Sequence, residues 1–382
     1  MTYSAGTEKK MKDYKIKDIK VHLVSQPITG GFADATRKVE SIGFTIVRVT
    51  TEDGIEGFGV TYHEVGGEAT KIMIEKNIAP KLTGRSPFET EKLWQEMFGY
   101  LRGVGRKGLM FCAYSAVDIA LWDLKGKILS VPLYQMFGGT ETKIPVYGSG
   151  GWTSYTDDEL VEEMVNLVKT DGYKNIKFKV GVEGGENPNR DLIRVQKVRE
   201  AVGPDIGIML DANNCWDAGT GARFANRVKD LDIMFLEEPV FADDMPGLRK
   251  YKNTTDLPLA TGEHEYTKWG ARDLLLHSGT DYIQCDGTRA GGFTEMLKIG
   301  ALTQAFNVKF APHAMENIHI HLISAFHNAP FLERLVLFED ITAKVYLDAP
   351  KPVDGFMTIP EDMPGLGLQL NMDFINEYDE KF

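Results

Sequence analysis

Cysteine is scarce in this chain. Only three of its 382 residues are cysteines, Cys112, Cys215 and Cys285, and they lie far apart with no C-x-x-C pair among them. A disulfide framework and a zinc ribbon are therefore both excluded. Because free cysteines suit a reducing compartment, we expect a cytoplasmic protein.

Long apolar runs and an excess of basic charge are also lacking. No run of about 18 apolar residues occurs, and the lysine-rich N-terminus has no apolar segment of the kind found in signal peptides. We therefore expect no contact with a membrane. The chain has 43 Lys and Arg against 55 Asp and Glu, a formal net charge of −12. This balance argues against a nucleic-acid partner, because nucleic-acid-binding proteins present basic surfaces.

Two common enzyme motifs are absent as well. The glycine-rich stretches at 148–151 and 181–185 do not lead into G-K-[ST], and no G-x-G-x-x-G follows the first strand, so nucleotide binding has little support. No G-x-S-x-G occurs either, which argues against a hydrolase with a nucleophile elbow.

The composition is that of an ordinary soluble globular protein, with 43% hydrophobic and 26% charged residues. A length of 382 residues predicts two or three domains. Residues 16–62 have the pattern of β-strands, with Asp53 and Gly54 as a hairpin turn. Helical periodicity follows up to about residue 139, so this part of the chain is predicted to form an α+β domain.

From residue 144 onward, short apolar strands alternate with amphipathic helices, up to an eighth strand at 331–338. Each later strand ends at or near a polar residue, and these residues are 20 to 32 positions apart. They are Lys179, Asp211, Glu237, Glu263, Asp286, His313 and Glu333. Such spacing fits one strand, one helix and their loops, and therefore predicts parallel βα units. A closed (β/α) barrel, which carries its chemistry at strand ends, is favoured over an open doubly wound sheet.

Asp211, Glu237 and Glu263 lie at three successive strand ends. In a closed barrel they would converge, and three carboxylates without Cys or His form an all-oxygen site suited to Mg²⁺ or Mn²⁺. Each acid taken alone could instead cap a helix or carry a surface charge. Glu238 would point to the opposite side of a regular strand from Glu237, so we expect a supporting or structural role for it.

Two lysines, Lys177 and Lys179, alternate along one predicted strand. Both ammonium groups are expected to face into the barrel, about 6.6 Å apart at the backbone. Repulsion of about 2.5 kcal/mol at that distance predicts that the pKa of one lysine falls, which would make it a usable base. The alternative, a pair of exposed lysines at a sheet edge, is disfavoured on a buried parallel strand.

Asp286 and His313 end adjacent predicted strands. A carboxylate beside an imidazole fixes its tautomer and raises its basicity, so the two are expected to form an acid/base dyad. Glu333 on the last strand could donate a hydrogen bond to an oxyanion if protonated, or form a salt bridge, and the sequence leaves both open. His319 and His321 face different ways on a predicted helix, which argues against a metal site formed by this pair.

The chain resembles the mandelate racemase subgroup of the enolase superfamily. The resemblance rests on D-I-A-L-W-D-L-K-G-K at 118–127, on V-P-L-Y-Q-M-F-G-G at 131–139 and on the strand-end residues. It implies an α/β fold, a (β/α)₇β modified TIM barrel with an N-terminal α+β capping domain. The implied boundaries are 1–140 for the capping domain, 141–345 for the catalytic barrel, and 346–382 for a C-terminal segment that returns to the capping domain.

The resemblance also implies roles for the site residues. The implied Mg²⁺ ligands are Asp211, Glu237 and Glu263. Lys179 would be a base on one face of the substrate, and His313 with Asp286 would serve the other face. Lys177 would contact the substrate carboxylate and tune Lys179.

The same resemblance implies roles for Glu333, for Asn213 and for two loops of the capping domain. Glu333 matches the family's hydrogen-bond donor to the enolate, and Asn213 would lie near the substrate. Loops at 26–37 and 62–68 would close over the mouth of the barrel and set substrate choice. The candidate contacts in them are Phe32, Arg37, Tyr62 and His63, each of which could equally be ordinary loop surface.

Residues 311–322 resemble the corresponding stretch of the L-talarate/galactarate dehydratases, and G-E-H-E-Y-T at 262–267 is common among sugar-acid dehydratases. The implied activity is that of a hydro-lyase dependent on Mg²⁺, with Mn²⁺ as a substitute. It would remove the proton next to the carboxylate of an aldonate or aldarate, eliminate the C3 hydroxyl and give a 2-keto-3-deoxy sugar acid. Chain length, stereochemistry, syn or anti elimination and the initiating base, Lys179 or His313, stay open.

Two other functions fit parts of the pattern. Racemisation or epimerisation of a 2-hydroxy or sugar acid through the same enolate also needs acid/base groups on both faces. A non-catalytic sugar-acid binder or structural oligomer has no need for all three acids and both lysines. Because barrels of this family commonly associate, we expect a homo-oligomer.

Overall fold

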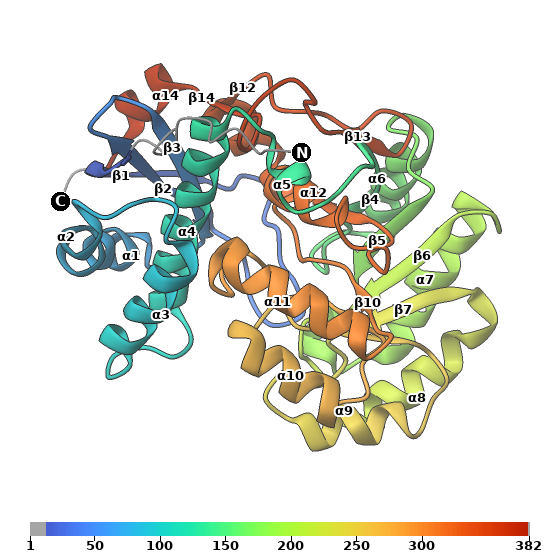
Figure 1. Cartoon of the computed structure of the whole chain (residues 1–382). Helices are drawn as coiled ribbons and strands as arrows, with labels where there is room; N and C mark the ends of the chain where they lie inside the picture. The colour runs from blue at the N-terminus through green and yellow to red at the C-terminus, as the bar shows by residue number, and fades with distance from the viewer. Residues whose placement is uncertain (1–12, 381–382) are drawn as a thin grey trace, which may run out of the picture.

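Three antiparallel strands form the first sheet of the computed structural model, which describes residues 13–380 (Figure 1). They are β1 (Ile16–Pro27), β2 (Ser41–Thr51) and β3 (Glu56–His63). Asp53 and Gly54 lie in the turn between β2 and β3, as predicted, and Gly54 has a φ of 81° there. The expectation that the N-terminus is not a signal peptide concerns mostly residues 1–12, which lie outside the described range.

Helices cover one face of this sheet and complete the predicted α+β capping domain. They are α1 (Gly67–Met73), a π-helical turn (Ile74–Ile78), α2 (Ala79–Leu82), α3 (Thr90–Leu101), α4 (Leu109–Leu129) and α5 (Leu133–Met136). Two glycines of β3 let α4 approach closely. A Cβ atom on Gly59 would lie 2.1 Å from the carbonyl oxygen of Ala116, and one on Gly57 would lie 2.4 Å from the backbone nitrogen of Leu124. The missing side chains therefore set the distance between sheet and helix.

Eight parallel strands form the second part of the molecule. They are β4 (Lys143–Gly150), β5 (Asn175–Lys179), β6 (Gly207–Asp211), β7 (Ile233–Glu237), β8 (Leu259–Thr261), β9 (Tyr282–Ile283), β10 (Lys309–Phe310) and β11 (Leu332–Leu335). The strands pair in the order β10-β9-β8-β7-β6-β5-β4-β11, so the last strand lies beside the first and the sheet curls into a barrel. The predicted modified TIM barrel is confirmed.

The barrel has a seam between β10 and β11. No strand ladder joins these two strands among the described residues, but the backbone nitrogen of Phe310 donates to the carbonyl oxygen of Asn328 just before β11 (3.0 Å). The predicted eighth strand, 331–338, is shorter than expected, because Val336–Phe338 form a 3₁₀ turn instead. Side chains from the strands fill the barrel interior, including Tyr147, Phe235, Tyr282 and Phe331.

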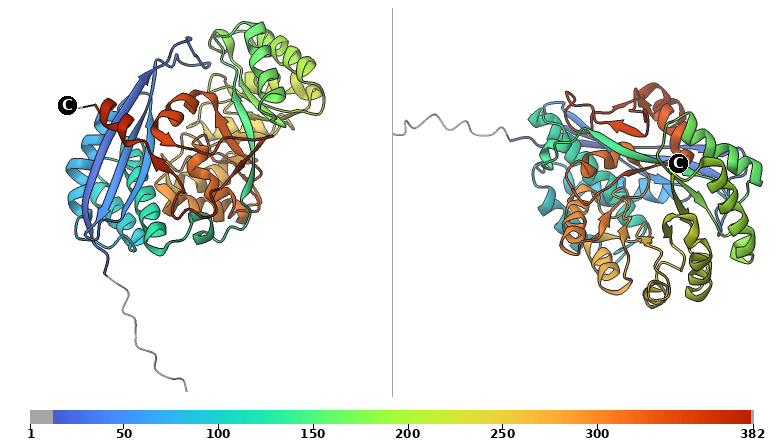
Figure 2. Two further views of the ribbon diagram at one scale, coloured as in Figure 1. Left: turned by 90° about the horizontal axis from the view of Figure 1, so that it is seen from above. Right: turned by 90° about the vertical axis from the view of Figure 1, so that its right-hand side faces the viewer.

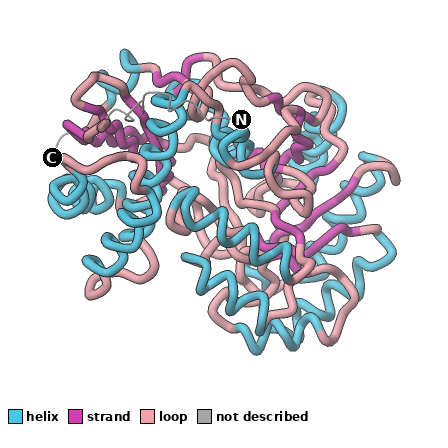
Figure 3. Tube along the Cα trace, viewed as in Figure 1, coloured by secondary structure: helices cyan, strands magenta, loops and turns pink. Residues whose placement is uncertain are grey.

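Helices surround the strands on the outside, as Figures 1 and 3 show. They are α6 (Asp157–Lys169), α7 (Pro188–Val202), α8 (Ala218–Val228), α9 (Met245–Lys252), α10 (Thr267–His277), α11 (Gly292–Ala305) and α12 (Glu316–Ile323), with short 3₁₀ turns at Val182–Gly185 and Lys229–Leu231. Helix α6 starts with a capping box formed by Thr156 and Glu159, and Asp217 caps α8.

The capping domain docks on the N-terminus of α11 through polar side chains of α4. Asp118 accepts hydrogen bonds from the backbone nitrogen (2.9 Å) and the hydroxyl (2.6 Å) of Thr294. The hydroxyl of Ser115 accepts from the backbone nitrogen of Gly291 (2.8 Å). Burial raises the pKa of Asp118 to about 7, against the hydrogen bonds from Thr294. These bonds satisfy backbone donors that the start of a helix leaves free.

Two other connections join the parts of the molecule (Figure 2). The loop between β1 and β2 reaches across to the barrel, where the backbone nitrogen of Thr153 donates to the carbonyl oxygen of Ala33 (2.9 Å). The C-terminal segment runs back to β1 in the capping domain. It contains α13 (Glu339–Val345), β12 (Tyr346–Leu347), β13 (Phe356–Thr358), β14 (Gln369–Leu370) and α14 (Met372–Tyr378).

No helix within residues 13–380 combines the length and the apolar composition that crossing a bilayer requires.

Candidate active site

One pocket lies where the carboxyl ends of the barrel strands meet the loops of the capping domain. It receives side chains from both parts of the chain. The lining residues are Asp34, Arg37, Val39, Tyr62 and Glu64 from the capping domain, and Trp152, Lys179, Asn213, Glu263, His313, Leu335, Leu337 and Phe338 from the barrel. Of the strand-end positions predicted from the sequence, Lys179, Glu263 and His313 line the pocket together with part of the predicted capping loops, whereas Asp211, Glu237, Asp286 and Glu333 do not.

Lys177 and Lys179 are both buried at the end of β5. The Nζ atom of Lys177 lies 2.6 Å from Oε2 of Glu237 and 2.7 Å from Oε1 of Glu333. The Nζ atom of Lys179 lies 2.5 Å from Oδ2 of Asp211. Each ammonium group is thus paired with carboxylates from neighbouring strands, which compensates for its removal from water.

This pairing reverses the predicted direction of the lysine pKa. Burial lowers the pKa of Lys177, but Glu237 and Glu333 outweigh it and hold that pKa well above its ordinary value. Burial and the charge of Lys177 lower the pKa of Lys179, yet the carboxylates of Asp211, Glu237 and Glu263 together hold it above its ordinary value. The prediction of a lowered lysine pKa was therefore wrong for this arrangement, because it considered the repulsion between the lysines without the carboxylates beside them.

Asp211, Glu237 and Glu263 lie on or just beyond β6, β7 and β8, and all three are buried. Oδ1 of Asp211 accepts a hydrogen bond from the backbone nitrogen of Asn213 (2.9 Å). Oε1 of Glu237 is buried without a hydrogen-bond partner, and so is Oδ1 of Asn213. Unpartnered buried oxygens of this kind can serve as ligand atoms for a cation.

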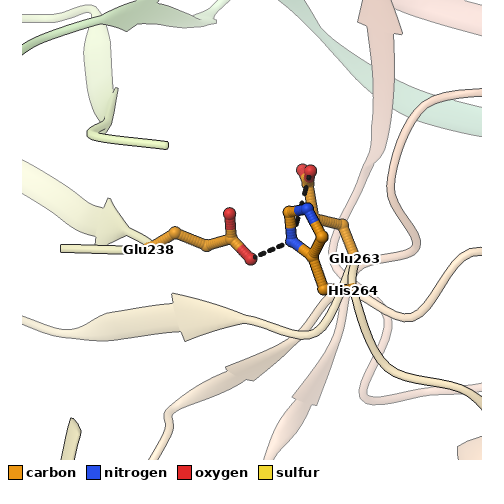
Figure 4. Close-up of side chains that lie close together, drawn as sticks. All are labelled: Glu238, Glu263 and His264. Carbon is orange, nitrogen blue, oxygen red and sulfur yellow. Dashed lines mark hydrogen bonds and ion pairs between the residues drawn. The ribbon is translucent and has the colours of Figure 1, made fainter. Parts of the chain in front are cut away.

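Glu238 does not point away from this cluster as a regular strand would require. Strand β7 ends at Glu237, and Glu238 has a φ of 41°, outside the strand region. Its Oε1 lies 2.8 Å from Nδ1 of His264, and ligand atoms of Glu238, Glu263 and His264 all lie within 4.8 Å of one another (Figure 4). The irregular backbone turns Glu238 toward Glu263, so the expected orientation was wrong, whereas its supporting role stays a prediction. Its Oε2 accepts a hydrogen bond from Asn214.

Carboxyl groups gather at this end of the barrel. The buried ones are those of Asp211, Glu237, Glu238, Glu263, Asp286 and Glu333, and Lys177, Lys179 and His313 are buried among them. Burial raises the pKa of Glu237 to about 8, with further contributions from the neighbouring acids and against the pull of Lys177. An excess of carboxylate oxygens with no thiolate fits a hard divalent cation such as Mg²⁺.

His313 lies between two carboxylates. Its Nδ1 atom lies 3.3 Å from Oδ2 of Asp286, and its Nε2 atom lies 3.2 Å from Oε2 of Glu263. Burial lowers the pKa of His313, but Glu263 and Asp286 raise it to about 9. Asp286 is held in place by the backbone nitrogen (2.7 Å) and hydroxyl (2.8 Å) of Thr288. The geometry can therefore fix the tautomer of His313 and leave Nε2 toward the pocket.

The structure favours the salt-bridged form of Glu333 over the protonated form. Besides Lys177, its carboxylate accepts a hydrogen bond from the backbone nitrogen of Ala314 (2.9 Å). Burial raises the pKa of Glu333, but Lys177 and His313 lower it to about 2. His319 and His321 take separate structural partners, the carbonyl oxygens of Ala314 and Leu366.

The predicted capping residues divide into two groups. Arg37 and Tyr62 line the pocket, whereas Phe32 and His63 do not. Phe32 stacks on Trp152 with ring centroids 5.0 Å apart. His63 points toward Ser25, whose hydroxyl lies 3.1 Å from its Nε2 atom, and burial lowers the pKa of His63 to about 4.

Several residues of the site were not predicted. Asp34, Glu64 and Trp152 line the pocket, and the guanidinium of Arg289 lies 3.0 Å from the hydroxyl of Tyr62. Arg289 follows the strand-end residue Asp286 by three positions, which was a usable signal. Asp34 and Glu64 lie in capping loops, where spacing gives no guide to which side chain turns inward.

The sequence matches two family profiles that together cover most of the chain. Residues 17–138 match the profile described as mandelate racemase / muconate lactonizing enzyme, N-terminal domain. Residues 159–374 match the profile described as enolase C-terminal domain-like. Among curated proteins, the chain is 36% identical to the L-rhamnonate dehydratase of Saccharopolyspora erythraea over 346 residues, which are 87% of this chain and 84% of that protein.

Solved structures give the same picture. The L-talarate/galactarate dehydratase of Salmonella typhimurium, liganded with Mg and L-lyxarohydroxamate, superposes with a TM-score of 0.90 at 29% identity and covers all of this chain and 96% of its own. A racemase from Streptomyces coelicolor with bound magnesium superposes with a TM-score of 0.89 at 28% identity, over 96% of this chain and 100% of its own. Both kinds of chemistry thus occur on closely similar folds.

Proposed function

The chain belongs to the mandelate racemase / muconate lactonizing enzyme family of the enolase superfamily, and from that premise we propose that it is an Mg²⁺-dependent dehydratase of an acid sugar. The observation that carries the proposal is that Lys179, His313 and Glu263 line one pocket, with Asp286 behind His313. The groups that transfer protons and the acidic cation site would then contact the same bound substrate. Relatives that are 30–36% identical are named L-rhamnonate, arabinonate and L-talarate/galactarate dehydratase, which supports the reaction class.

The acids fit a divalent cation, and Asp211, Glu237 and Glu263 are the residues that would hold it. Bound there, Mg²⁺ or Mn²⁺ would stabilise the negative charge that gathers on the substrate carboxylate as the neighbouring proton leaves, as in enolase-superfamily sites with a Lys or His base. Lys177, which lies between two of the strand-end carboxylates, would bind the substrate carboxylate.

The elimination step needs two proton transfers. One residue, Lys179 or His313 in its unprotonated form, takes the proton from C2, and the C2–H electrons form the enolate. His313 in its protonated form then gives a proton to the C3 hydroxyl, the C3–O bond breaks and water leaves. The resulting enol becomes the 2-keto-3-deoxy acid when C3 gains a proton and the C2 hydroxyl gives one up. Asp286 keeps the imidazole of His313 in one orientation throughout.

Epimerisation at C2 is the second candidate. It uses the same enolate but returns a proton to the opposite face of C2, and the similarity to a racemase of Streptomyces coelicolor favours it. The two reactions differ in outcome, because epimerisation exchanges the C2 hydrogen with solvent and loses no water.

The test is a library of aldonates and aldarates incubated with the protein and Mg²⁺, with 2-keto acid detected by its semicarbazone. We expect turnover of one or two diastereomers, which falls by at least about 1,000-fold in Lys179→Met and His313→Asn. Lys197→Met, a change of a lysine that pairs with Asp157 outside the pocket, is the matched control and keeps full activity. Deuterium at C2 without 2-keto acid establishes epimerisation instead, and silence in both assays overturns both functions.

A further inference from the structure

Arg37 lies at the capping-domain end of the pocket, between two carboxylates. Its two terminal nitrogens lie 2.9 Å from the two carboxylate oxygens of Glu64, a bidentate pair. Its Nε atom lies 3.4 Å from Oδ2 of Asp34. All three nitrogens of the guanidinium are thus engaged within the protein, and a pair of this geometry is strong and directional.

Asp34 cannot readily turn away from Arg37. Its Oδ1 accepts hydrogen bonds from the backbone nitrogens of Thr36 (2.7 Å) and Arg37 (2.9 Å) and from the hydroxyl of Thr36 (2.8 Å). Its side chain is only 7% exposed, and that of Glu64 is 15% exposed. Both carboxylates are therefore fixed parts of the pocket wall and not mobile surface groups.

Arg37 has no unpaired charge to offer a substrate group at this end. Two carboxylates, those of Asp34 and Glu64, face its guanidinium, and the nearby cation Arg289 bonds to the hydroxyl of Tyr62. Lys179 also lines the pocket, and the reacting carboxylate of the substrate is proposed to bind beside it and Lys177. The pairing of Arg37 therefore disfavours a second negative group at its end of the pocket.

We infer that the pocket accepts acid sugars with one carboxylate and rejects the corresponding diacids. This inference rests on the proposed function, and it narrows the substrate from acid sugars in general to aldonates. A terminal hydroxyl at the Arg37 end can donate hydrogen bonds to Asp34 or Glu64, whereas a second carboxylate would meet two acceptors and an arginine that is already paired.

The experiment compares pairs that differ only at the far end, a hexonate and the hexarate of the same configuration, such as galactonate and galactarate. Turnover is measured with Mg²⁺ in the unchanged protein. Binding is measured by calorimetry, with Mg²⁺ present, in Lys179→Met so that no product forms. For the hexonate with the fastest turnover, we expect kcat/KM to exceed that of the matching hexarate by about 100-fold and the affinity by at least about tenfold.

Glu64→Gln provides the second arm, because it removes one carboxylate and leaves the size of the side chain unchanged. Arg37 is then opposed by Asp34 alone, so the preference for the monoacid should fall by at least about tenfold. Glu56→Gln is the matched control. Glu56 also pairs with an arginine through two hydrogen bonds, to Arg48 (2.9 and 2.7 Å), but at the other end of β3. It should leave the preference unchanged.

The outcomes separate the inference from the function. Dehydration of hexarates as readily as hexonates, or an unchanged preference in Glu64→Gln, overturns the inference and leaves the dehydratase in place. Tighter binding of the monoacid without any dehydration supports the inference and overturns the function. If neither member of any pair binds or reacts, both are wrong.

Discussion

At the scale of single residues, the candidate site is a set of paired buried charges. Lys177 and His313 each contact two strand-end carboxylates, and Lys179 contacts one. Removing one member of such a pair leaves the other charge buried and uncompensated. Substitutions that keep shape but change charge are therefore the informative ones, and each needs a check that the variant still folds.

Mg²⁺ should stabilise the folded protein, because it binds the carboxylates only when the barrel brings them together. At a hundredfold excess over its Kd, the expected gain in free energy of unfolding is about 2.7 kcal/mol. Glu263→Gln should reduce that gain to less than half. Thermal unfolding with and without Mg²⁺, after treatment with a chelator, measures the gain in the unchanged protein and in Glu263→Gln. The control variant Glu56→Gln should gain as much as the unchanged protein. Equal gains in Glu263→Gln would remove Glu263 from the cation site.

His63 should make the protein sensitive to mild acid. Burial lowers its pKa from 6.5 to about 4, so the folded state prefers the neutral ring and the unfolded state takes up a proton first. The stability contributed by the neutral ring is complete above pH 6.5 and is lost as the pH falls toward 4, by about 3 kcal/mol. The free energies of unfolding of the unchanged protein and of His63→Gln, measured with a denaturant between pH 7 and pH 4, should therefore converge by about that amount. Parallel curves would contradict the prediction.

Residue positions could be predicted better than residue states. The strand-end series follows from spacing alone, and the structure brings Lys179, Glu263 and His313 to one pocket. The protonation of Lys179 could not be predicted, because it depends on Asp211, which lies 32 positions away in sequence and 2.5 Å away in space. The same holds for the orientation of the His63 side chain, which is set by its packing in the capping domain.

At the scale of helices and strands, the contact between α4 and β3 depends on bare backbone. Gly59→Ala should lower the free energy of unfolding by about 3 kcal/mol or more, since the added methyl group meets the carbonyl oxygen of Ala116 and cannot be accommodated by a side-chain rotation. Gly99→Ala is the matched control. No atom lies near a Cβ at that position of α3, so the same change should stabilise the protein by about 0.5–1 kcal/mol. Denaturant unfolding compares the two, and losses of equal size would refute the packing argument.

The ends of the strands were the least predictable part of the fold. The sequence favours a strand through 331–338, yet β11 ends at Leu335. Phe338 packs against Tyr62 of the capping domain with ring centroids 5.0 Å apart, and Leu337 and Phe338 line the pocket. Contacts with a part of the chain nearly 280 residues earlier therefore override the local preference for a strand, and no local pattern carries that information.

At the scale of the whole molecule, the capping domain is built from both ends of the chain. Asp379 accepts a hydrogen bond from the backbone nitrogen of Leu23 (2.8 Å), and its carboxylate lies 2.9 Å from Nδ1 of His22 and 3.2 Å from Nζ of Lys71. The C-terminal segment thus holds β1 and α1 together, although more than 300 residues separate them from it in sequence.

Asp379→Ala should lower the free energy of unfolding by about 1–2 kcal/mol, because it removes the carboxylate that accepts from the partly buried backbone nitrogen of Leu23 and lies beside His22 and Lys71. Asp373→Ala, at an exposed position of α14, should change it by no more than about 0.5 kcal/mol. Limited proteolysis gives a second measure, since the C-terminal segment of Asp379→Ala should be cut faster. Equal stability of the two variants would show that the segment is held by its apolar contacts alone.

Because β4 pairs with β11, one edge of β4 stays unpaired for part of the time during which the chain is synthesised. The partner for this edge of β4 leaves the ribosome only about 185 residues after Gly150, which at about 5–20 residues per second means a delay of roughly 10–40 s. During that interval one side of β4 is an unsatisfied edge, and such edges pair with whatever strand is near. Newly made chains of this protein are therefore most exposed to misassembly on polysomes, and chaperone demand should peak before translation ends.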